Sequence, residues 1–265
     1  MILRAALSRK WLLTTLLVLA GGAVCVRLGI WQLDRLDQRR AFNAHVEAMR
    51  SESPLDLNAG IPAELTEMEY RAVVVSGTYD YGNQVALRNQ FYGDAYGYHL
   101  LTPLVLDDTS TSASTGSAQQ LSAGGRAVLV DRGWVPAEGN DSPSGWSRYD
   151  NGGQAQVRGV IRLGQAKAQI GGVPDPTLAP GQTRLDFWYV ANLERIAGQI
   201  PYPILPVYIQ PDPDPADTEP PIPFQPEIEL TEGPHLGYAL QWFTFAAILV
   251  AGYPFYLRKQ IAGKP

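Results

Sequence analysis

The residue with the most specific chemistry is His235, which stands directly before a long apolar run. On a helix, Tyr238 and Trp242 share the face of His235, with Ala239 beside them. An imidazole at the end of an apolar helix, above aromatic and small residues, can ligate the iron of a flat apolar macrocycle. The same histidine can instead bond a lipid headgroup or cap the helix, so both interpretations stay open.

A second polar group, Trp31, Gln32 and Arg35, follows an apolar run near the N-terminus. Such residues anchor a span at a membrane surface, with Trp among the headgroups and Arg on phosphate. Alternatively they meet the chain before the second run and frame the edge of a macrocycle, with Arg35 facing a propionate. Gln241 is polar within an apolar run, which predicts that it packs against the first span or another protein.

Further candidates lie in the middle of the chain and have mainly structural interpretations. Gly133, within Arg132-Gly133-Trp134, most simply allows a turn or bulge at a strand end, and Trp134 then packs on the core. Contact with a partner is the other possibility, and Tyr70 and Arg71 carry the same pair of interpretations. His99 is expected on a solvated or partly buried strand face.

Several classes of function are excluded by composition. The three histidines are widely separated, and one cysteine and three methionines form no cluster of soft ligands for copper. We find no phosphate-binding glycine loop and no G-x-S-x-G elbow, and the acidic pair Asp107 and Asp108 precedes a serine-rich tract. The sequence therefore predicts no enzyme. Residues 31–237 hold all 26 acidic but only 14 of 21 basic residues, a net charge of −12 that disfavours nucleic acid as a partner.

Two apolar runs predict membrane spans. The first has 16 uncharged residues from Trp11 to Val26, too few for a core of roughly 30 Å, so the span is expected to continue through Trp31 with Arg27 snorkelling. A signal peptide cleaved after Ala20 is the competing interpretation. The second run has 22 uncharged residues from Leu236 to Leu257.

Flanking charge orients these spans. Arg258 and Lys259 follow the second span and acidic residues precede it, which predicts that both ends lie in the cytoplasm. The expected divisions are a cytoplasmic N-terminus 1–10, a span 11–31, an extracytoplasmic domain 32–210 with a flexible insert 107–125, a proline-rich acidic tether 211–235, a span 236–257 and a cytoplasmic C-terminus 258–265.

The extracytoplasmic domain is predicted to be mostly β (α+β). Five closely spaced stretches rich in Val, Ile, Leu and aromatic residues are bounded by turn residues, which favours an antiparallel barrel or sandwich. They are 70–79, 84–89, 98–106, 126–135 and 155–163, followed by a short helix at 191–198 and a last strand at 204–209. The helix that leaves the membrane is expected to continue to about Arg50.

Four patterns in this order resemble the surfeit-locus (Surf/Shy) family of cytochrome oxidase assembly factors. They are W-Q-x-x-R from Trp31, Y-R-A-V from Tyr70, R-G-W-V-P from Arg132, and the stretch from His235 to Phe243. The resemblance covers nearly the whole chain, although Pro234 and Asp131 stand where the family often has Asn.

The resemblance implies a non-catalytic assembly factor that shelters or delivers haem a, with His235 as the iron ligand. The implied partners are the catalytic subunit of cytochrome c oxidase, haem a synthase and the lipid bilayer. The alternative is a stably bound accessory subunit without a cofactor role. The absence of an Arg/Ser-rich presequence favours a bacterial inner (plasma) membrane over the mitochondrial inner membrane.

Overall fold

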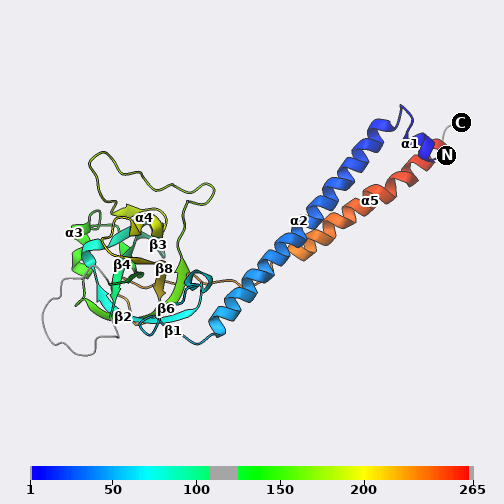
Figure 1. Cartoon of the computed structure of the whole chain (residues 1–265). Helices are drawn as coiled ribbons and strands as arrows, with labels where there is room; N and C mark the ends of the chain where they lie inside the picture. Colours follow the sequence, from blue (N-terminus) through cyan, green and yellow to red (C-terminus); the bar gives the residue numbers. More distant parts are fainter. Residues whose placement is uncertain (1, 108–124, 263–265) are drawn as a thin grey trace. The chain divides into compact units, whose positions relative to one another are not determined.

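The computed structural model describes residues 2–107 and 125–262, which form two units. One is a helical unit made from the two ends of the chain, residues 1–45 and 228–265, and the other is a β domain at 46–227 (Figure 1). Most of the predicted insert, residues 108–124, lies outside the described residues.

The helical unit consists of two long helices and one short one. Helix α2 runs from Leu12 to Ser51 and α5 from His235 to Ala262, and the short α1, Ile2–Ala6, lies near α5. At about 1.5 Å per residue both long helices exceed the thickness of a bilayer core. Mean hydropathy reaches 2.0 in α2 and 1.4 in α5, so both helices are long and apolar enough to span a membrane, as predicted.

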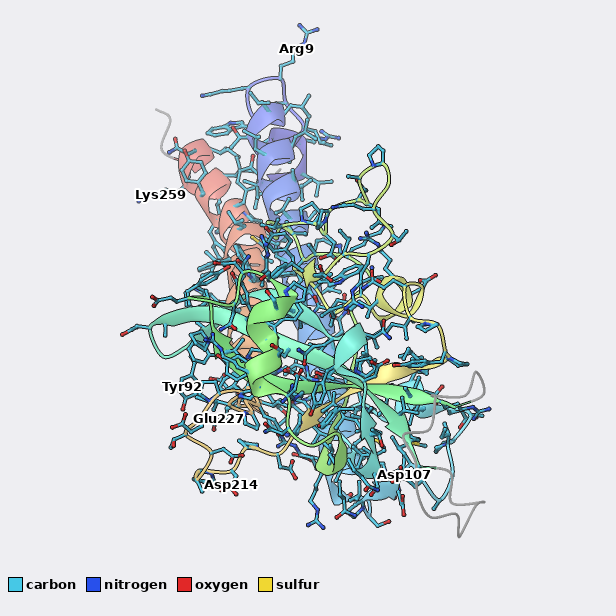
Figure 2. All side chains as sticks on the ribbon, turned by 90° about the vertical axis from the view of Figure 1, so that its left-hand side faces the viewer. Arg9, Tyr92, Asp107, Asp214, Glu227 and Lys259 are labelled. Carbon is cyan, nitrogen blue, oxygen red and sulfur yellow. The ribbon has the colours of Figure 1, made fainter. Side chains whose placement is uncertain are left out.

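Both ends of the chain lie at the same end of this helix pair (Figure 1). Arg9 and Lys259 are found there, and Figure 2 shows their side chains projecting near that end. This geometry is what two antiparallel spans require. Helix α5 continues five residues past the predicted end of its span at Leu257, to Ala262.

Small residues allow α2 and α5 to pack closely. A Cβ atom built on Gly29 would lie 2.6 Å from the Phe243 ring, and one on Gly22 would lie 3.0 Å from Val250. Residues buried along α2 recur at alternating spacings of three and four, from Gly22 through Cys25 and Gly29. That spacing is the seam of an antiparallel pair with coiled-coil geometry.

The β domain contains a closed barrel. Its strands are β1 (Leu55–Asp56), β2 (Ala72–Tyr79), β3 (Val85–Tyr92), β4 (Ala95–Leu106), β5 (Ala127–Pro136), β6 (Gln154–Leu163), β7 (Phe187–Trp188) and β8 (Ile204–Pro211). The order β2–β6–β8–β5–β4 closes because β4 also pairs with β2. Most of these pairs are antiparallel, but β5 and β8 are parallel. The predicted strands are therefore confirmed, and the barrel alternative is the right one.

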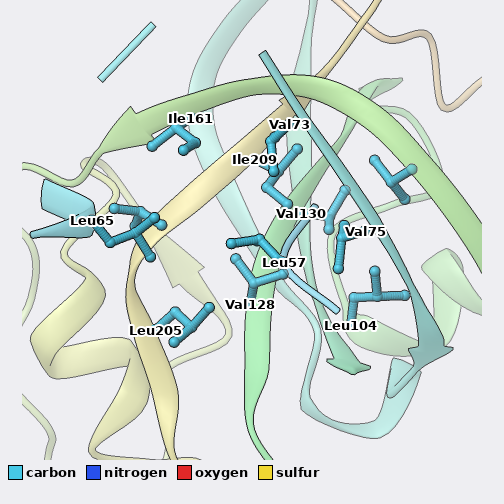
Figure 3. Close-up of a cluster of buried hydrophobic side chains, with 12 residues drawn as sticks. Leu57, Leu65, Val73, Val75, Leu104, Val128, Val130, Ile161, Leu205 and Ile209 are labelled. Carbon is cyan, nitrogen blue, oxygen red and sulfur yellow. The ribbon is translucent and has the colours of Figure 1, made fainter. Parts of the chain in front are cut away.

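Buried side chains fill both sides of the central strands. In β2 alternate residues such as Val73 and Val75 point inward, and they meet Leu104, Val128 and Ile209 in the barrel interior (Figure 3). β4 and β5 are buried on both faces because a second cluster covers their outer side. That cover includes the short helix α4, Leu193–Ala197. Another short helix, α3, spans Pro143–Trp146.

The first part of the predicted tether is extended but is attached to the barrel. Ile222 forms a two-way backbone bridge with Trp134, at 2.8 and 2.9 Å, and its side chain is buried. The Gln225 amide donates to the carbonyl oxygens of Gln210 and Pro211, both at 3.0 Å. The proline-rich composition predicted a stiff segment but not its contacts with the barrel. Because of these contacts we call residues 211–227 the strap.

Candidate functional site

The candidate site is a polar pair at the end of the helix seam that leads to the β domain. His235 is the first residue of α5, and its Nδ1 lies 2.8 Å from Oε1 of Gln32 on α2. An amide oxygen only accepts hydrogen bonds, so Nδ1 is the donor in this bond and Nε2 is the ring nitrogen left for a ligand. The two residues were separate candidates in the sequence, and the structure brings them together.

Four further contacts hold the chain just before His235 against α2. The Arg39 guanidinium donates to the carbonyl oxygens of Thr231, at 2.9 Å, and Glu229. Asn43 Nδ2 donates to the carbonyl of Leu230 at 2.8 Å. Arg40 and Glu232 form a two-bonded ion pair at 2.8 and 3.0 Å, which we include with these contacts in the clasp.

The clasp was missed in the sequence. Arg39 and Arg40 follow the first span closely, and the only signal for their partners was the acidic segment 227–232 before the second span. The hydrogen bond and charge of Arg40 lower the pKa of the Glu232 carboxyl. This pair is fully exposed, so its contribution is screened by solvent and the clasp depends mainly on the carbonyl contacts.

The aromatic candidates present surface beside the pair. Trp31 is 41% exposed and Tyr238 is 49% exposed. Trp242 is half-buried, with its ring edge-on to Phe245 at 5.9 Å. Tyr238 is thus accessible on α5 three residues after His235, and its role beside the histidine stays a prediction.

Two predicted contacts are placed differently. Arg35 stacks on its neighbour Trp31 at 5.6 Å and donates to Gln38 at 2.9 Å, so it stays on its own helix, while Arg39 and Arg40 meet the chain before α5. Gln241 is exposed on α5, and its contact with another protein stays a prediction.

The candidates in the β domain occupy structural positions. Gly133 has φ of +117° at a bulge in β5, and Trp134 is buried against the strap. Arg132 is buried over the rings of Tyr79 and Tyr81, at 5.5 and 4.9 Å. Burial raises the pKa of Tyr79 to about 12, although the Arg132 charge opposes that rise.

Tyr70 and Arg71 hold the start of β2. Tyr70 has φ of +74° and lies under the Arg162 guanidinium at 4.7 Å. Arg71 donates to the carbonyl of Ser53 at 3.1 and 3.2 Å. The roles of these side chains toward partners stay predictions.

His99 was expected on a solvated or partly buried face, and this was wrong. Its side chain is buried, and Nδ1 lies 2.9 and 3.1 Å from the two oxygens of Asp131. The bulge in β5 explains the contact, because the extra residue brings Asp131 into register with Leu101, two positions along β4 from His99 and so on the same face of the sheet. The sequence signal for this buried contact was that His99 and Asp131 are both polar residues inside apolar strands.

Comparison with known proteins identifies the chain. A sequence model of the SURF1 family matches residues 19–247, which include Gln32 and His235, the clasp and the whole barrel. The chain belongs to the SURF1 family. The SURF1 match thus spans the helical unit and the β domain together.

Individual SURF1 relatives cover a similar length. The "SURF1-like protein" of Monosiga brevicollis is 29% identical over 88% of this chain and 83% of its own length. "Surfeit locus protein 1" of Xenopus tropicalis is 24% identical over 90% of this chain and 72% of its own. The "Cytochrome oxidase assembly protein SHY1" of Saccharomyces cerevisiae is 28% identical over a shorter stretch, 42% of this chain and 25% of its own.

Proposed function

We propose that this chain is a membrane-anchored, non-catalytic assembly factor for cytochrome oxidase that accepts haem a at His235. The observation that carries the proposal is the hydrogen bond from His235 Nδ1 to Gln32. It fixes the ring and the tautomer, which is how a ligating histidine is usually held by its surroundings. The printed names of the relatives support the assembly role.

The residues present fit a haem at this position. Nε2 of His235 is the ligand atom, and Trp31, Tyr238 and Trp242 offer aromatic surface for the edge of a macrocycle. Haem a, when bound, would supply its iron as the acceptor of the Nε2 lone pair. The clasp fixes the backbone before His235, so the imidazole is positioned before any ligand arrives, which lowers the cost of binding.

Membrane orientation follows from the same unit. Arg9 and Lys259 lie at the same end of the helix pair (Figure 2), with Lys10 and Arg258 next to them in the sequence, which supports a cytoplasmic position for both ends. Arg39 and Arg40 at the other end are occupied by the clasp. The β domain then faces the opposite side of a bacterial plasma membrane and contributes the surface for the oxidase's catalytic subunit.

The test is haem a binding by purified protein. We expect His235→Ala to abolish the optical signature and Gln32→Leu to weaken affinity by roughly 10- to 100-fold, as loss of a supporting hydrogen bond to a ligand does. Tyr238→Phe is the matched control and keeps its ring. Unchanged haem a uptake by His235→Ala refutes the proposed ligand.

Co-purification with the oxidase separates the two roles that the sequence left open. An assembly factor is substoichiometric in mature oxidase, and its deletion leaves haem-poor enzyme. An accessory subunit is present at one per complex, and its loss leaves haem content intact. The second result would replace the proposed role.

A further inference from the structure

The hairpin formed by β3 and β4 continues past the strands that flank it. β3 stays paired with β4 as far as Tyr92, at its last residue. On its other side, β3 pairs with β7 only near its start, and the pairing of β4 with β5 begins only at Gly97. The residues beyond these flanking strands, 91–96, are all exposed, and we call them the hairpin tip.

The hairpin tip carries aromatic side chains on both of its faces. Phe91 and Tyr96 are partners in the register, so they share one face, and their ring centres lie 5.5 Å apart. Tyr92 is on the opposite face, where its ring centre lies 5.5 Å from that of Trp134. Phe91 is 60% exposed, Tyr92 44% and Tyr96 42%. Exposed apolar groups gathered in this way mark a contact with a protein or a membrane.

The chemistry of the hairpin tip favours a lipid headgroup layer as that contact. A tyrosine ring combines an apolar body with a polar hydroxyl, and aromatic side chains of this kind are enriched at membrane–water interfaces. Rings on both faces need an occupant that surrounds the tip, which a fluid headgroup layer does and a single face of a protein does not. Asp94 is the only charged residue among 91–96, so little charge has to be buried on insertion.

The hairpin tip also lies beside the segment of chain that returns to the second long helix. Trp134, the neighbour of Tyr92, forms the backbone bridge with Ile222 of the strap. The strap then leads to His235, the first residue of α5. Figure 2 shows Tyr92 and the strap residue Glu227 on the same side of the β domain. Because both ends of the β domain continue into apolar helices, a bilayer surface is held near it at high effective concentration.

We propose that the hairpin tip inserts Phe91, Tyr92 and Tyr96 among the lipid headgroups of the membrane that α2 and α5 span. The rings leave water for the boundary between headgroups and acyl chains, and the tyrosine hydroxyls keep their hydrogen bonds to headgroup oxygen atoms or water. The net charge of −12 over residues 31–237 gives no attraction to anionic lipid, so the contact is apolar and does not require such lipid. The inference needs only the two spans and does not rest on haem a binding.

The test measures the depth of the hairpin tip in a bilayer. Full-length protein with Cys25→Ala receives a nitroxide label at Asp94→Cys and is reconstituted in phosphatidylcholine vesicles. Electron paramagnetic resonance then compares collisions of the label with oxygen, which concentrates in the bilayer, and with a water-soluble nickel chelate. The matched control carries the label at Thr177→Cys, an exposed position elsewhere in the β domain. We expect the ratio of oxygen to nickel collisions to be severalfold higher at position 94 than at position 177.

A second set of variants changes the rings of the labelled tip. Phe91→Ser with Tyr96→Ser should lower the ratio to that of the control, whereas the exchange Phe91→Tyr with Tyr96→Phe keeps both rings and should keep the ratio. Both side chains are exposed, so the β domain should stay folded, which urea unfolding checks. All these variants carry the same label, so insertion driven by the label itself would survive the loss of the rings. High salt should leave the ratio unchanged, because it screens charges and not apolar contacts.

Three results would overturn the inference. A ratio at position 94 equal to that of the control, in vesicles with and without phosphatidylglycerol, means that the tip stays in water. An unchanged ratio after Phe91→Ser with Tyr96→Ser means that the rings do not hold the tip in the bilayer. Protection of the label only after cytochrome oxidase is added to the vesicles assigns the tip to a protein partner instead. None of these results bears on haem a uptake at His235, which is tested separately.

Discussion

The docking of the strap on β5 depends on the absence of a side chain at Gly133. A Cβ atom there would lie 2.2 Å from the carbonyl oxygen of Ile222 and 2.6 Å from the nitrogen of Pro223, both rigid backbone atoms. The residue also has φ of +117°, where an L side chain is strained. Gly133→Ala should therefore release the strap from the barrel.

The expected cost follows from the interactions that detachment of the strap would break. Two backbone hydrogen bonds between Trp134 and Ile222 are worth about 0.5–1.5 kcal/mol each. Exposing the Ile222 side chain, now 8% exposed, costs about 1.5–3 kcal/mol. Complete detachment of the strap in Gly133→Ala should therefore lower the free energy of unfolding of the β domain by roughly 2.5–6 kcal/mol.

The assay is limited proteolysis of the full-length protein together with urea unfolding. We expect cleavage within residues 211–227 to accelerate by at least tenfold in Gly133→Ala. Gly152→Ala is the matched control, because Gly152 also has positive φ, +56°, but nothing lies within 4 Å of its added Cβ. If the two variants are equally protected, the strap is not held by the contact with Gly133 and the reasoning is wrong.

Three other predictions concern the helix seam, the clasp and the buried histidine. Gly29→Ala should push the helices apart at Phe243 and lower the Tm of the solubilised protein, whereas Gly21→Ala, whose Cβ meets Leu249 at an ordinary 3.6 Å, should change the Tm little. Arg39→Ala should speed amide hydrogen exchange of residues 229–232 more than Arg40→Ala does, because Arg39 binds two carbonyl groups and Arg40 binds only an exposed carboxylate. Faster exchange in Arg40→Ala than in Arg39→Ala would contradict the clasp as described. The pKa of His99 is higher in the folded protein than its unfolded value of about 6.5. The stabilisation from its pairing with Asp131 is therefore complete below about pH 6.5 and is lost as the pH rises through the pKa of the folded protein. The difference in free energy of unfolding between wild type and His99→Gln should accordingly be larger at pH 5.5 than at pH 9. Burial raises the pKa of the nearby Tyr208 to about 12, so this tyrosine stays neutral over that range. A difference that does not change with pH would refute the ion pair.

Local signals were enough to predict the spans and most strands. Apolar runs of a length set by the bilayer marked both helices, and turn residues bounded the strands within a few positions. The strands β1 and β7 were missed because each has two residues and pairs in parallel with a distant partner. Barrel closure through β2 and β4 and the parallel pair β5–β8 likewise depend on long-range pairing that no local pattern encodes.

The candidate site was predictable in parts but not as an assembly. His235 and Gln32 could each be chosen from residue type and position beside an apolar run. Their contact joins residues 203 positions apart, so it depends on the antiparallel register of two helices. The pairing of His99 with Asp131 was not predicted, because a bulge in β5, and not the regular alternation of a strand, brings them together.

The pairing of Gln32 with His235 has a consequence for how the molecule is made. Gln32 is synthesised before the barrel and His235 only after it, 203 positions later. The site therefore does not exist until α5 has been made and has packed on α2. A truncation that removes α5 leaves the whole barrel in the chain but no partner for Gln32, so an intact site requires both long helices.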